Sequence, residues 1–482
     1  MKKIGIIILM VLVILVGYLA YTTITAPNLQ RNIKANTPPN LSDSAILHFQ
    51  QAISFQTISY DDAKKWDSVP FIQFRHFLET TYPFVHQKLE REIISQYTLV
   101  YKWQGTNLNL APFILMAHQD VVPIEESTRK QWTFEPFSGT IKDGYIWGRG
   151  TTDDKINLIS IFESAEKLLR ENYQPKRTVY FVFGHDEEIG GKQGAVKVAE
   201  LFKARNIKAD LIMDEGGIIT REKVPGIHKP VALIGTAEKG YMSLELSVNK
   251  KGGHSSQPDK ETAIDILNKA LVKLRNQPFE TRFTEPMQGF MQYLGPSMQF
   301  PNNMAFANPT LFKRLIVNSY EKQGAGNAMI RTTAVPTIIQ AGIKDNVIPT
   351  LATAVVNFRL LPGDSASFVF HKVQEIVNDK RVRVKHYDKN ISEASATTPT
   401  NSVAFSRIDS IVKSSYDSVV SAPFLLIGAT DSRHFTEVSA NIIKFSPMVD
   451  PIGFHGIDER VSMDSYHRSI WFFEQFLRSL KN

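Results

Sequence analysis

The stretch TVYFVFGHDEEIGG, residues 178–191, is the part of the sequence that decides the fold. Its first six residues are rich in β-branched and aromatic side chains and predict a buried strand. Asp186, Glu187 and Glu188 follow, before two glycines. Adjacent carboxylates repel one another and resist burial. The stretch is therefore either a solvated surface turn or a place where bound cations neutralise the acids.

Strands and helices are expected to alternate on both sides of this stretch. Apolar runs at residues 111–118 and 209–217 predict two more strands, and amphipathic patterns at 153–172 and 194–206 predict helices. Strands separated by helices of this length are typical of βαβ units. The predicted fold class is therefore α/β, with a mixed, mostly parallel sheet flanked by helices.

The pattern changes near residue 240. Half-exposed strands and amphipathic helices are expected from there on, at residues 241–256, 262–276, 352–364, 366–379 and 381–388. They predict a small α/β sandwich with helices on one face. Because βα character returns near residue 400, we predict a catalytic domain in two segments, 45–240 and 393–482, with a smaller domain inserted at 241–392.

The N-terminal segment is strongly apolar. MKK precedes IGIIILMVLVILVGYLA, residues 4–20, which carries no charge. We predict a membrane anchor over residues 1–22, with a cleaved signal segment as the alternative, and a linker over residues 23–44. Lys2 and Lys3 place the N-terminus in the cytoplasm and the body outside it, in the periplasm or the extracellular space.

Composition excludes several classes of site. The chain of 482 residues has no cysteine, which excludes disulfides, cysteine-ligated zinc and cysteine nucleophiles. Its formal charge of +7 is spread along the chain rather than gathered in basic runs. A nucleic-acid partner is therefore not expected.

Metal-capable side chains recur at the ends of the predicted strands or in the loops that follow them. Five residues share this position: His118, Asp153, Glu188, Asp214 and His455. Taken alone, His118 and His455 are more often satisfied polar or turn residues. An Asp-Glu-Glu turn is usually a solvated loop, and Asp214 could equally be a helix cap. Together the five residues should meet where the carboxyl ends of parallel strands form a crevice. Imidazoles and carboxylates without thiolates suit zinc or a similar ion, and one bridging carboxylate suits a two-metal site.

The sequence also resembles a known family. The motifs MAHQDVVP, WGRGTTDDK, GHDEEIGG, MDEGG, GGHSSQP and FHGIDERV occur in the order found in the co-catalytic di-zinc aminoacylase/carboxypeptidase metallopeptidases. The resemblance extends from about residue 45 to the end of the sequence. GHDEEIGG, GATDSRHF and the apolar N-terminus look closest to the branch of the Gly-X carboxypeptidase and the N-fatty-acyl-amino-acid hydrolase/synthase.

This resemblance implies a role for each matching residue. His118, Asp153 and Asp214 would hold one zinc ion, and Asp153, Glu188 and His455 the other, with cobalt or manganese as alternatives. Asp120 would orient His118, and Glu187 would be the general base. The inserted domain would be either a lid or a dimerisation domain, and in the second case the chain would form a homodimer through it. From this domain His254 would polarise the scissile carbonyl. Arg359 and Asn346 would contact the substrate, and Arg359 would bind the carboxylate of the substrate.

The predicted function is zinc-dependent hydrolysis of an amide bond beside a free α-carboxylate, in a dipeptide or an N-acyl amino acid. The specific alternative is an N-fatty-acyl-amino-acid synthase/hydrolase, and a non-catalytic metal-binding scaffold is the alternative from another class. MQGFMQYLGPSMQF, residues 287–300, suits either a lipidic substrate or ordinary core packing. The loop ATDSRHF, residues 429–435, either lines the substrate pocket or braces His455.

Overall fold

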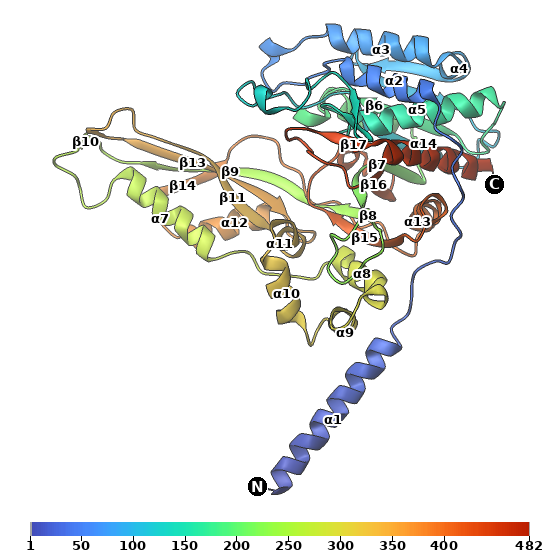
Figure 1. Ribbon diagram of the computed structural model, residues 1–482. Helices are drawn as coiled ribbons and strands as arrows, with labels where there is room; N and C mark the ends of the chain where they lie inside the picture. Colours follow the sequence, from blue (N-terminus) through green and yellow to red (C-terminus); the bar gives the residue numbers. More distant parts are fainter. Residues whose placement is uncertain (1, 482) are drawn as a thin grey trace.

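A mixed sheet of eight strands forms the centre of the molecule, in the order β1-β2-β6-β3-β7-β16-β8-β15 (Figure 1). The computed structural model describes residues 2–481. The strands are β1 (Glu90–Ile94), β2 (Thr98–Trp103), β3 (Phe113–His118), β6 (Val179–Gly184), β7 (Leu211–Thr220), β8 (Val231–Glu238), β15 (Val420–Leu426) and β16 (Ile442–Val449). Four of the seven neighbouring pairs are parallel, which confirms the predicted fold class.

Helices cover both faces of this sheet because its strands are apolar on both sides. On β3, Leu115 and Ala117 pack into the core on one face, whereas Ile114 and Met116 pack into the core on the other. The first face carries α2 (Asp43–Ser54), α3 (Val69–Thr81), α4 (Pro83–Lys88), α5 (Lys155–Arg170), α13 (Val403–Ser415) and α14 (Met463–Arg478). The second face carries α6 (Ala195–Ala204).

Short elements complete this part of the chain. A small sheet beside the main one has the order β17-β5-β4. Its strands are β4 (Thr140–Lys142), β5 (Tyr145–Trp147) and β17 (Arg460–Ser462). Single 3₁₀ turns occur at η1 (Ala63–Lys65), η2 (Arg129–Gln131), η3 (Glu187–Ile189), η4 (Gly295–Ser297), η5 (Asp431–Phe435) and η6 (Ser479–Lys481).

The inserted segment forms a second, antiparallel sheet in the order β11-β13-β9-β14, which extends away from the main sheet (Figure 1). Its elements are β9 (Gly240–Asn249), β11 (Thr333–Ala341), β13 (Leu351–Leu360), β14 (Val382–His386), α7 (Ala263–Asn276) and α12 (Ala366–Val377). Both helices pack on one face around Leu244, Leu267 and Val373. A two-stranded ribbon of β10 (Gly253–His254) and β12 (Val347–Ile348) lies at the far end.

Four helices between these strands pack against the main sheet. They are α8 (Glu285–Leu294), α9 (Asn302–Ala307), α10 (Lys313–Glu321) and α11 (Gly324–Ile330). Met287 and Phe290 of α8 share a core with Val420 and Ala422 of the edge strand β15. Burial of that apolar edge explains their position. The domain boundaries predicted above stay a prediction. Helices α8 to α11 fall within the predicted inserted domain, 241–392, but contact the main sheet.

The N-terminal helix α1 (Lys2–Ile24) stands away from the body and exposes its apolar side chains (Figure 1). It is long and apolar enough to cross a membrane. Met1, part of the predicted segment 1–22, lies outside the described residues. The chain that follows α1 is extended and bound along the body: Gln30 Nε2 donates to the carbonyl oxygen of Ser421 (2.8 Å), and Ser421 N donates to Gln30 Oε1 (3.0 Å). The predicted linker therefore covers the edge of β15.

Candidate metal centre and substrate cleft

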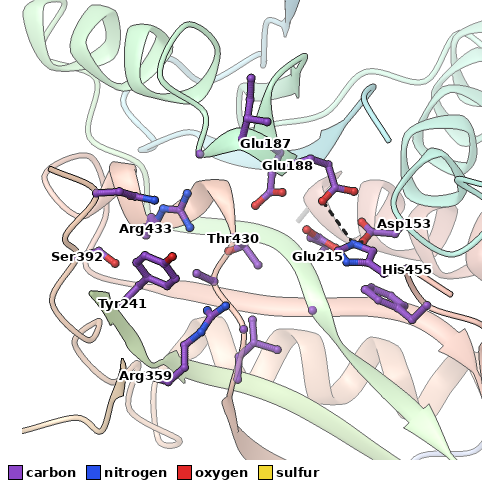
Figure 2. A pocket seen from close by; sticks show the side chains of 18 of the residues that line it. Asp153, Glu187, Glu188, Glu215, Tyr241, Arg359, Ser392, Thr430, Arg433 and His455 are labelled. Atoms are coloured by element: carbon purple, nitrogen blue, oxygen red, sulfur yellow. Dashed lines mark hydrogen bonds and ion pairs between the residues drawn. The ribbon is translucent and has the colours of Figure 1, made fainter. Parts of the chain in front are cut away.

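A cleft of about 540 Å³ lies between the main sheet and the inserted sheet. Figure 2 shows acidic groups and His455 on one side of it and the guanidinium groups of Arg359 and Arg433 on the other. The acidic side chains that line the cleft are Asp61, Asp153, Glu187, Glu188 and Glu215. Most of them come from strand ends and the loops that follow, where the sequence placed the site.

Asp153 lies at the centre of the acidic side, between two imidazoles. Its Oδ1 is 2.8 Å from His118 Nε2, and its Oδ2 is 2.6 Å from His455 Nε2. Glu215 Oε1 is 3.5 Å from the same His118 nitrogen, and Glu188 Oε2 is 3.4 Å from the His455 nitrogen. The residues thus form two triplets that share Asp153, which is the arrangement of a bridging carboxylate.

The loop that carries Asp153 is held by the buried carboxylate of Glu459. Glu459 Oε1 accepts hydrogen bonds from Gly150 N (3.0 Å), Thr152 N (2.8 Å) and Thr152 Oγ1 (2.9 Å). Its other oxygen accepts a hydrogen bond from Arg149, whose guanidinium also donates to the His455 carbonyl oxygen (3.2 Å). Glu459 therefore positions both sides of the centre. It lies within the motif FHGIDERV, although no role was predicted for it.

Asp120 supports the other loop of the site. Its carboxylate accepts hydrogen bonds from Ser59 Oγ (2.6 Å), Glu187 N (3.2 Å) and Glu188 N (3.1 Å). Its backbone carbonyl accepts the hydrogen bond of His118 Nδ1 (3.0 Å), while its Oδ1 lies 3.4 Å from that nitrogen. Asp120 thus lies where it can orient His118 and also holds the turn η3, which carries Glu187 and Glu188.

Asp214, which the sequence predicted as a metal ligand, lies outside the cluster. Its two carboxylate oxygens accept hydrogen bonds from the backbone amides of Glu215 (2.9 Å) and Ser432 (2.8 Å). Its neighbour Glu215 faces His118 instead. Successive side chains of a strand point to opposite faces, so a shift of one residue exchanges them. The motif MDEGG contains both acids, and its letters do not say which one faces the crevice.

The donor set fits divalent cations. Because a carbonyl oxygen only accepts, Nδ1 of His118 donates to Asp120, and Nε2 faces the oxygens of Asp153 and Glu215, as a donor when the ring is protonated and as a metal ligand when the ring is neutral. Glu188 Oε1 has no hydrogen-bond partner among residues 2–481. Groups within reach of a single ion include His118 with Asp153 and Glu188, and His118 with Asp154 and Glu215. A cation would satisfy these atoms.

The pKa values of the cluster follow from burial and crowding. Burial and the charge of Asp153 raise the pKa of Glu188 to about 7 and that of Glu215 to about 8. Burial also raises the pKa of Glu187 well above its ordinary value, and Asp431, Glu215 and Glu188 add to it. For Asp153, hydrogen bonds from His118 and His455 outweigh burial and hold the pKa below its usual range. The carboxylates are therefore costly to keep charged without a cation.

The cationic side of the cleft is formed by Arg359 and Arg433. The guanidinium of Arg359 lies over the ring of Tyr241, 5.0 Å from its centre, and burial lowers its pKa. Arg433 and Thr430 of the loop 429–435 also line the cleft, whereas His434 Nε2 lies 3.3 Å from the carbonyl oxygen of Gly190. This loop therefore lines the pocket, as one of the two expectations stated. Tyr241 was not anticipated from the sequence.

His254 and Asn346 do not line this cleft. His254 is exposed on β10, where its Nδ1 lies 2.8 Å from Ser256 Oγ. The carbonyl oxygen of Asn346 accepts a hydrogen bond from Ser255 N (3.1 Å) in the same ribbon. Figure 1 shows β10 at the far end of the inserted domain. Within one chain the two residues are neighbours of each other and not of the acidic cluster.

Comparison with known proteins identifies the family. Residues 114–479 match the model of peptidase family M20/M25/M40. The chain belongs to this family. It is a metallohydrolase. Probable carboxypeptidase S-like 2 of Dictyostelium discoideum is 39% identical over 89% of this chain and 83% of its own length. The N-fatty-acyl-amino acid synthase/hydrolase PM20D1 of Xenopus tropicalis is 33% identical over 99% of this chain and 93% of its own.

Solved structures of M20 proteins share the fold at low sequence identity. The M20 family metallo-carboxypeptidase Sso-CP2 from Sulfolobus solfataricus superposes with a TM-score of 0.67 at 17% identity, covering 92% of this chain and all of that chain. Human carnosine dipeptidase 1 superposes with a TM-score of 0.62 at 13% identity, with the same coverage. The resemblance inferred from the motifs, including its carboxypeptidase and fatty-acyl-amino-acid branch, is thereby confirmed.

Proposed function

We propose that this M20 protein uses two zinc ions to hydrolyse the amide bond of an N-acyl amino acid or a dipeptide that carries a free α-carboxylate. The observation that carries the proposal is one cleft with the acid and imidazole cluster on one side and two guanidinium groups on the other. Cobalt and manganese are alternative metals for the same donors. The named activities of the two relatives above support this substrate class.

Metal ligands follow from the two triplets. We propose His118, Asp153 and Glu215 for one ion and His455, Asp153 and Glu188 for the other, so that Glu215 takes the role predicted for Asp214. Divalent ions held there would act as Lewis acids on the scissile carbonyl and on the attacking water.

Glu187 is the proposed general base. It lines the cleft beside the cluster, where its carboxylate could take a proton from a water bound at the cluster. Glu187 would then deliver this proton to the nitrogen of the leaving amine. On the opposite side, Arg359 and Arg433 would bind the substrate carboxylate through charge-assisted hydrogen bonds and so place the amide at the cluster.

A substrate pair that differs in one charge tests this function. The full-length protein, stripped with a chelator and reloaded with zinc, should hydrolyse N-acyl amino acids and dipeptides but act poorly on their methyl esters. Without added metal the rate should fall to background. A protein that binds zinc yet is inert towards both substrate classes would be a scaffold, and equal rates for acid and ester would remove the role of the guanidinium groups.

His254 and Asn346 are proposed to act only in a homodimer, where the far end of one inserted domain would reach the cleft of a second copy. Mixing Glu187→Gln protein with His254→Ala protein tests this, because a mixed dimer would contain one complete site. Activity should reappear on mixing. Two inactive variants that stay inactive together, in a preparation shown by sedimentation to exchange subunits, would contradict it.

The apolar helix α1 is proposed to anchor the protein in a membrane with the catalytic body outside the cytoplasm, or to direct secretion if it is cleaved. Its exposed apolar surface and the two lysines at its start support this orientation. Membrane fractionation with protease protection of intact cells would distinguish the anchored form from a released one. Protection of the body from external protease would contradict the orientation.

A further inference from the structure

A second cavity of about 520 Å³ lies between strands β7, β8 and β15 of the main sheet and helices α8 to α11. Its walls are mostly apolar and include Leu233 and Phe424 of the sheet together with Phe290, Phe306, Ile316 and Met329 of the helices. A cavity of this size is within the range that holds small-molecule ligands. Met287, Met291 and Leu294 of the segment 287–300 are buried in the adjoining core. This segment therefore contributes both to core packing and to the wall of the cavity.

This apolar cavity adjoins the cleft along two strands. Phe424 and Leu426 occupy alternate positions of β15 and therefore point to the same face; Phe424 lines the cavity and Leu426 lines the cleft. On β7, Gly216 lines the cleft and Ile218 lines the cavity. Two residues of an extended strand span only about 7 Å. The cleft and the apolar cavity thus adjoin along β7 and β15.

Gly216 and Leu426 lie at the boundary between the two hollows. A Cβ added to Gly216 would stand 2.9 Å from the Leu426 side chain, and the backbone of Gly216 has φ +134°. Any side chain at this position would therefore press on Leu426. The same Cβ would stand 3.1 Å from Cβ of Lys444, so the glycine leaves room for both side chains where the cleft meets the cavity.

The outer mouth of the cavity is close to the membrane helix. Leu315 of α10 lines the cavity and is 60% exposed, and Leu311 and Phe300 nearby are 56% and 75% exposed. Thr22 near the end of α1 donates a hydrogen bond to Asn308 (2.8 Å), directly after α9. Helices α9 and α10, near which these exposed apolar residues lie, are on the side of the body from which α1 emerges (Figure 1).

We propose that the apolar cavity holds the fatty acyl chain of an N-acyl amino acid whose carboxylate lies at Arg359 and Arg433, and that the chain enters from the membrane side. This inference rests on the proposed function, since it places the scissile amide between the guanidinium groups and the cavity. It commits the protein to long-chain substrates rather than dipeptides. Each methylene buried in the cavity should then improve kcat/KM by about fourfold until the cavity is full.

The test narrows the cavity without touching the acidic cluster. Leu233→Trp fills the cavity from the sheet, and Ser319→Trp, on the exposed side of α10, narrows its mouth with little risk to folding. Val272→Trp on the exposed face of α7 is the matched control. Substrates of one amino acid with acetyl, octanoyl and hexadecanoyl chains are compared on zinc-loaded, full-length protein in detergent micelles.

We expect both cavity variants to lose at least about tenfold in kcat/KM for the hexadecanoyl substrate, equivalent to two methylenes, and to keep the wild-type value for the acetyl substrate. Val272→Trp should match the wild type at every chain length. A chain-length profile that is the same in all four proteins would overturn the proposal.

A binding measurement separates this proposal from the proposed function. If the wild type hydrolyses no acyl amino acid at all, the proposed hydrolase function is wrong. Binding of a fluorescent long-chain fatty acid then tests by itself whether the cavity is an acyl-chain site. Binding that is lost in Leu233→Trp supports an acyl-chain site, and binding unchanged in that variant overturns it. Displacement by an N-hexadecanoyl amino acid identifies the substrate as the source of the chain, whereas displacement by phosphatidylcholine vesicles alone would overturn that assignment.

Discussion

The cleft and the apolar cavity have nearly the same volume, about 540 and 520 Å³, and are lined by the same strands β7 and β15, yet their chemistry is opposite. Glu215 and Leu426 line the cleft, and Ile218 and Phe424 line the cavity. Carboxylates are tolerable in the cleft because a cation can neutralise them, whereas the cavity offers no such compensation. Two or three residues along a strand thus separate a site for ions from a site for hydrocarbon.

The largest expected effect concerns the base in the cleft. Glu187→Gln should lower kcat by about 10²–10⁴-fold, because the amide cannot take a proton from water. KM and the amount of bound zinc should change little. Steady-state kinetics with metal analysis checks this, with Glu200→Gln on the exposed face of α6 as the control. A variant that keeps its kcat would exclude Glu187 as the base.

The next effect distinguishes two adjacent acids on β7. Glu215→Gln should remove a metal ligand and lower the affinity for one ion by more than about 100-fold, since the amide is a far weaker ligand than the carboxylate. Asp214→Asn, which changes only a group bonded to backbone amides, should lower it by about 10–100-fold at most. Equilibrium dialysis against buffered zinc measures both. The reverse order would return Asp214 to the ligand set.

A smaller effect is expected on the cationic side of the cleft. Arg359→Met should raise KM for a substrate with a free carboxylate by about 10–100-fold, the value of a hydrogen bond to a charged group. It should not change KM for the methyl ester. Kinetics on the acid and ester pair gives the answer, with Arg383→Met on the exposed strand β14 as the matched control. An equal change for acid and ester would mean that Arg359 supports the fold and does not bind the carboxylate.

The smallest effect concerns Lys239, which follows β8 and is hydrogen-bonded to the end of α11. Its Nζ donates to the carbonyl oxygens of Ala328 (2.8 Å) and Arg331 (2.7 Å) at the end of α11, and burial, helped by the charge of Arg359, lowers its pKa to about 7. The unfolded chain, with an ordinary lysine pKa near 10.4, binds more protons between these values. This group therefore makes the free energy of unfolding rise with pH from about 7 upwards, by at most about 1.4 kcal/mol per pH unit.

Lys239→Met should remove that slope. Urea unfolding of wild type and variant at several pH values between about 7 and 9 compares the two, with the exposed substitution Lys385→Met, on β14, as the control. The free energy of unfolding of the wild type minus that of the variant should rise with pH. Parallel curves would show that Lys239 keeps an ordinary pKa.

Much of the fold could be predicted because local patterns and burial agree. The strand expected before Asp186 is β6, and the helices expected at 153–172 and 194–206 are α5 and α6, each within a few residues. Asp153, Glu188, His118 and His455 meet because parallel strands end on one side of a sheet. The turn DEEIGG carries Glu187 and Glu188, and the carboxylate of Asp120 accepts hydrogen bonds from their backbone amides.

Other features depended on contacts between distant segments. Whether Asp214 or Glu215 faces His118 depends on the course of β7 beside β16, where the pairing register shifts. The hydrogen bonds of Glu459 to the loop of Asp153 join residues some 300 positions apart in the sequence. Those of Gln30 to β15 join residues nearly 400 positions apart. The cavity beneath α8 to α11 has no signature of its own, because the apolar residues that line it look the same as those that fill the adjoining core.

By itself the sequence determined which elements form, which family the chain belongs to and which residue types supply the chemistry, since hydrophobic periodicity and motif spacing are local properties. Only the tertiary structure decided which acid faces the imidazoles, that His254 lies far from the cleft of its own chain, and that an apolar hollow adjoins the acidic one. The physical reason is that the direction of a side chain and the space left between helices are set by packing among distant segments.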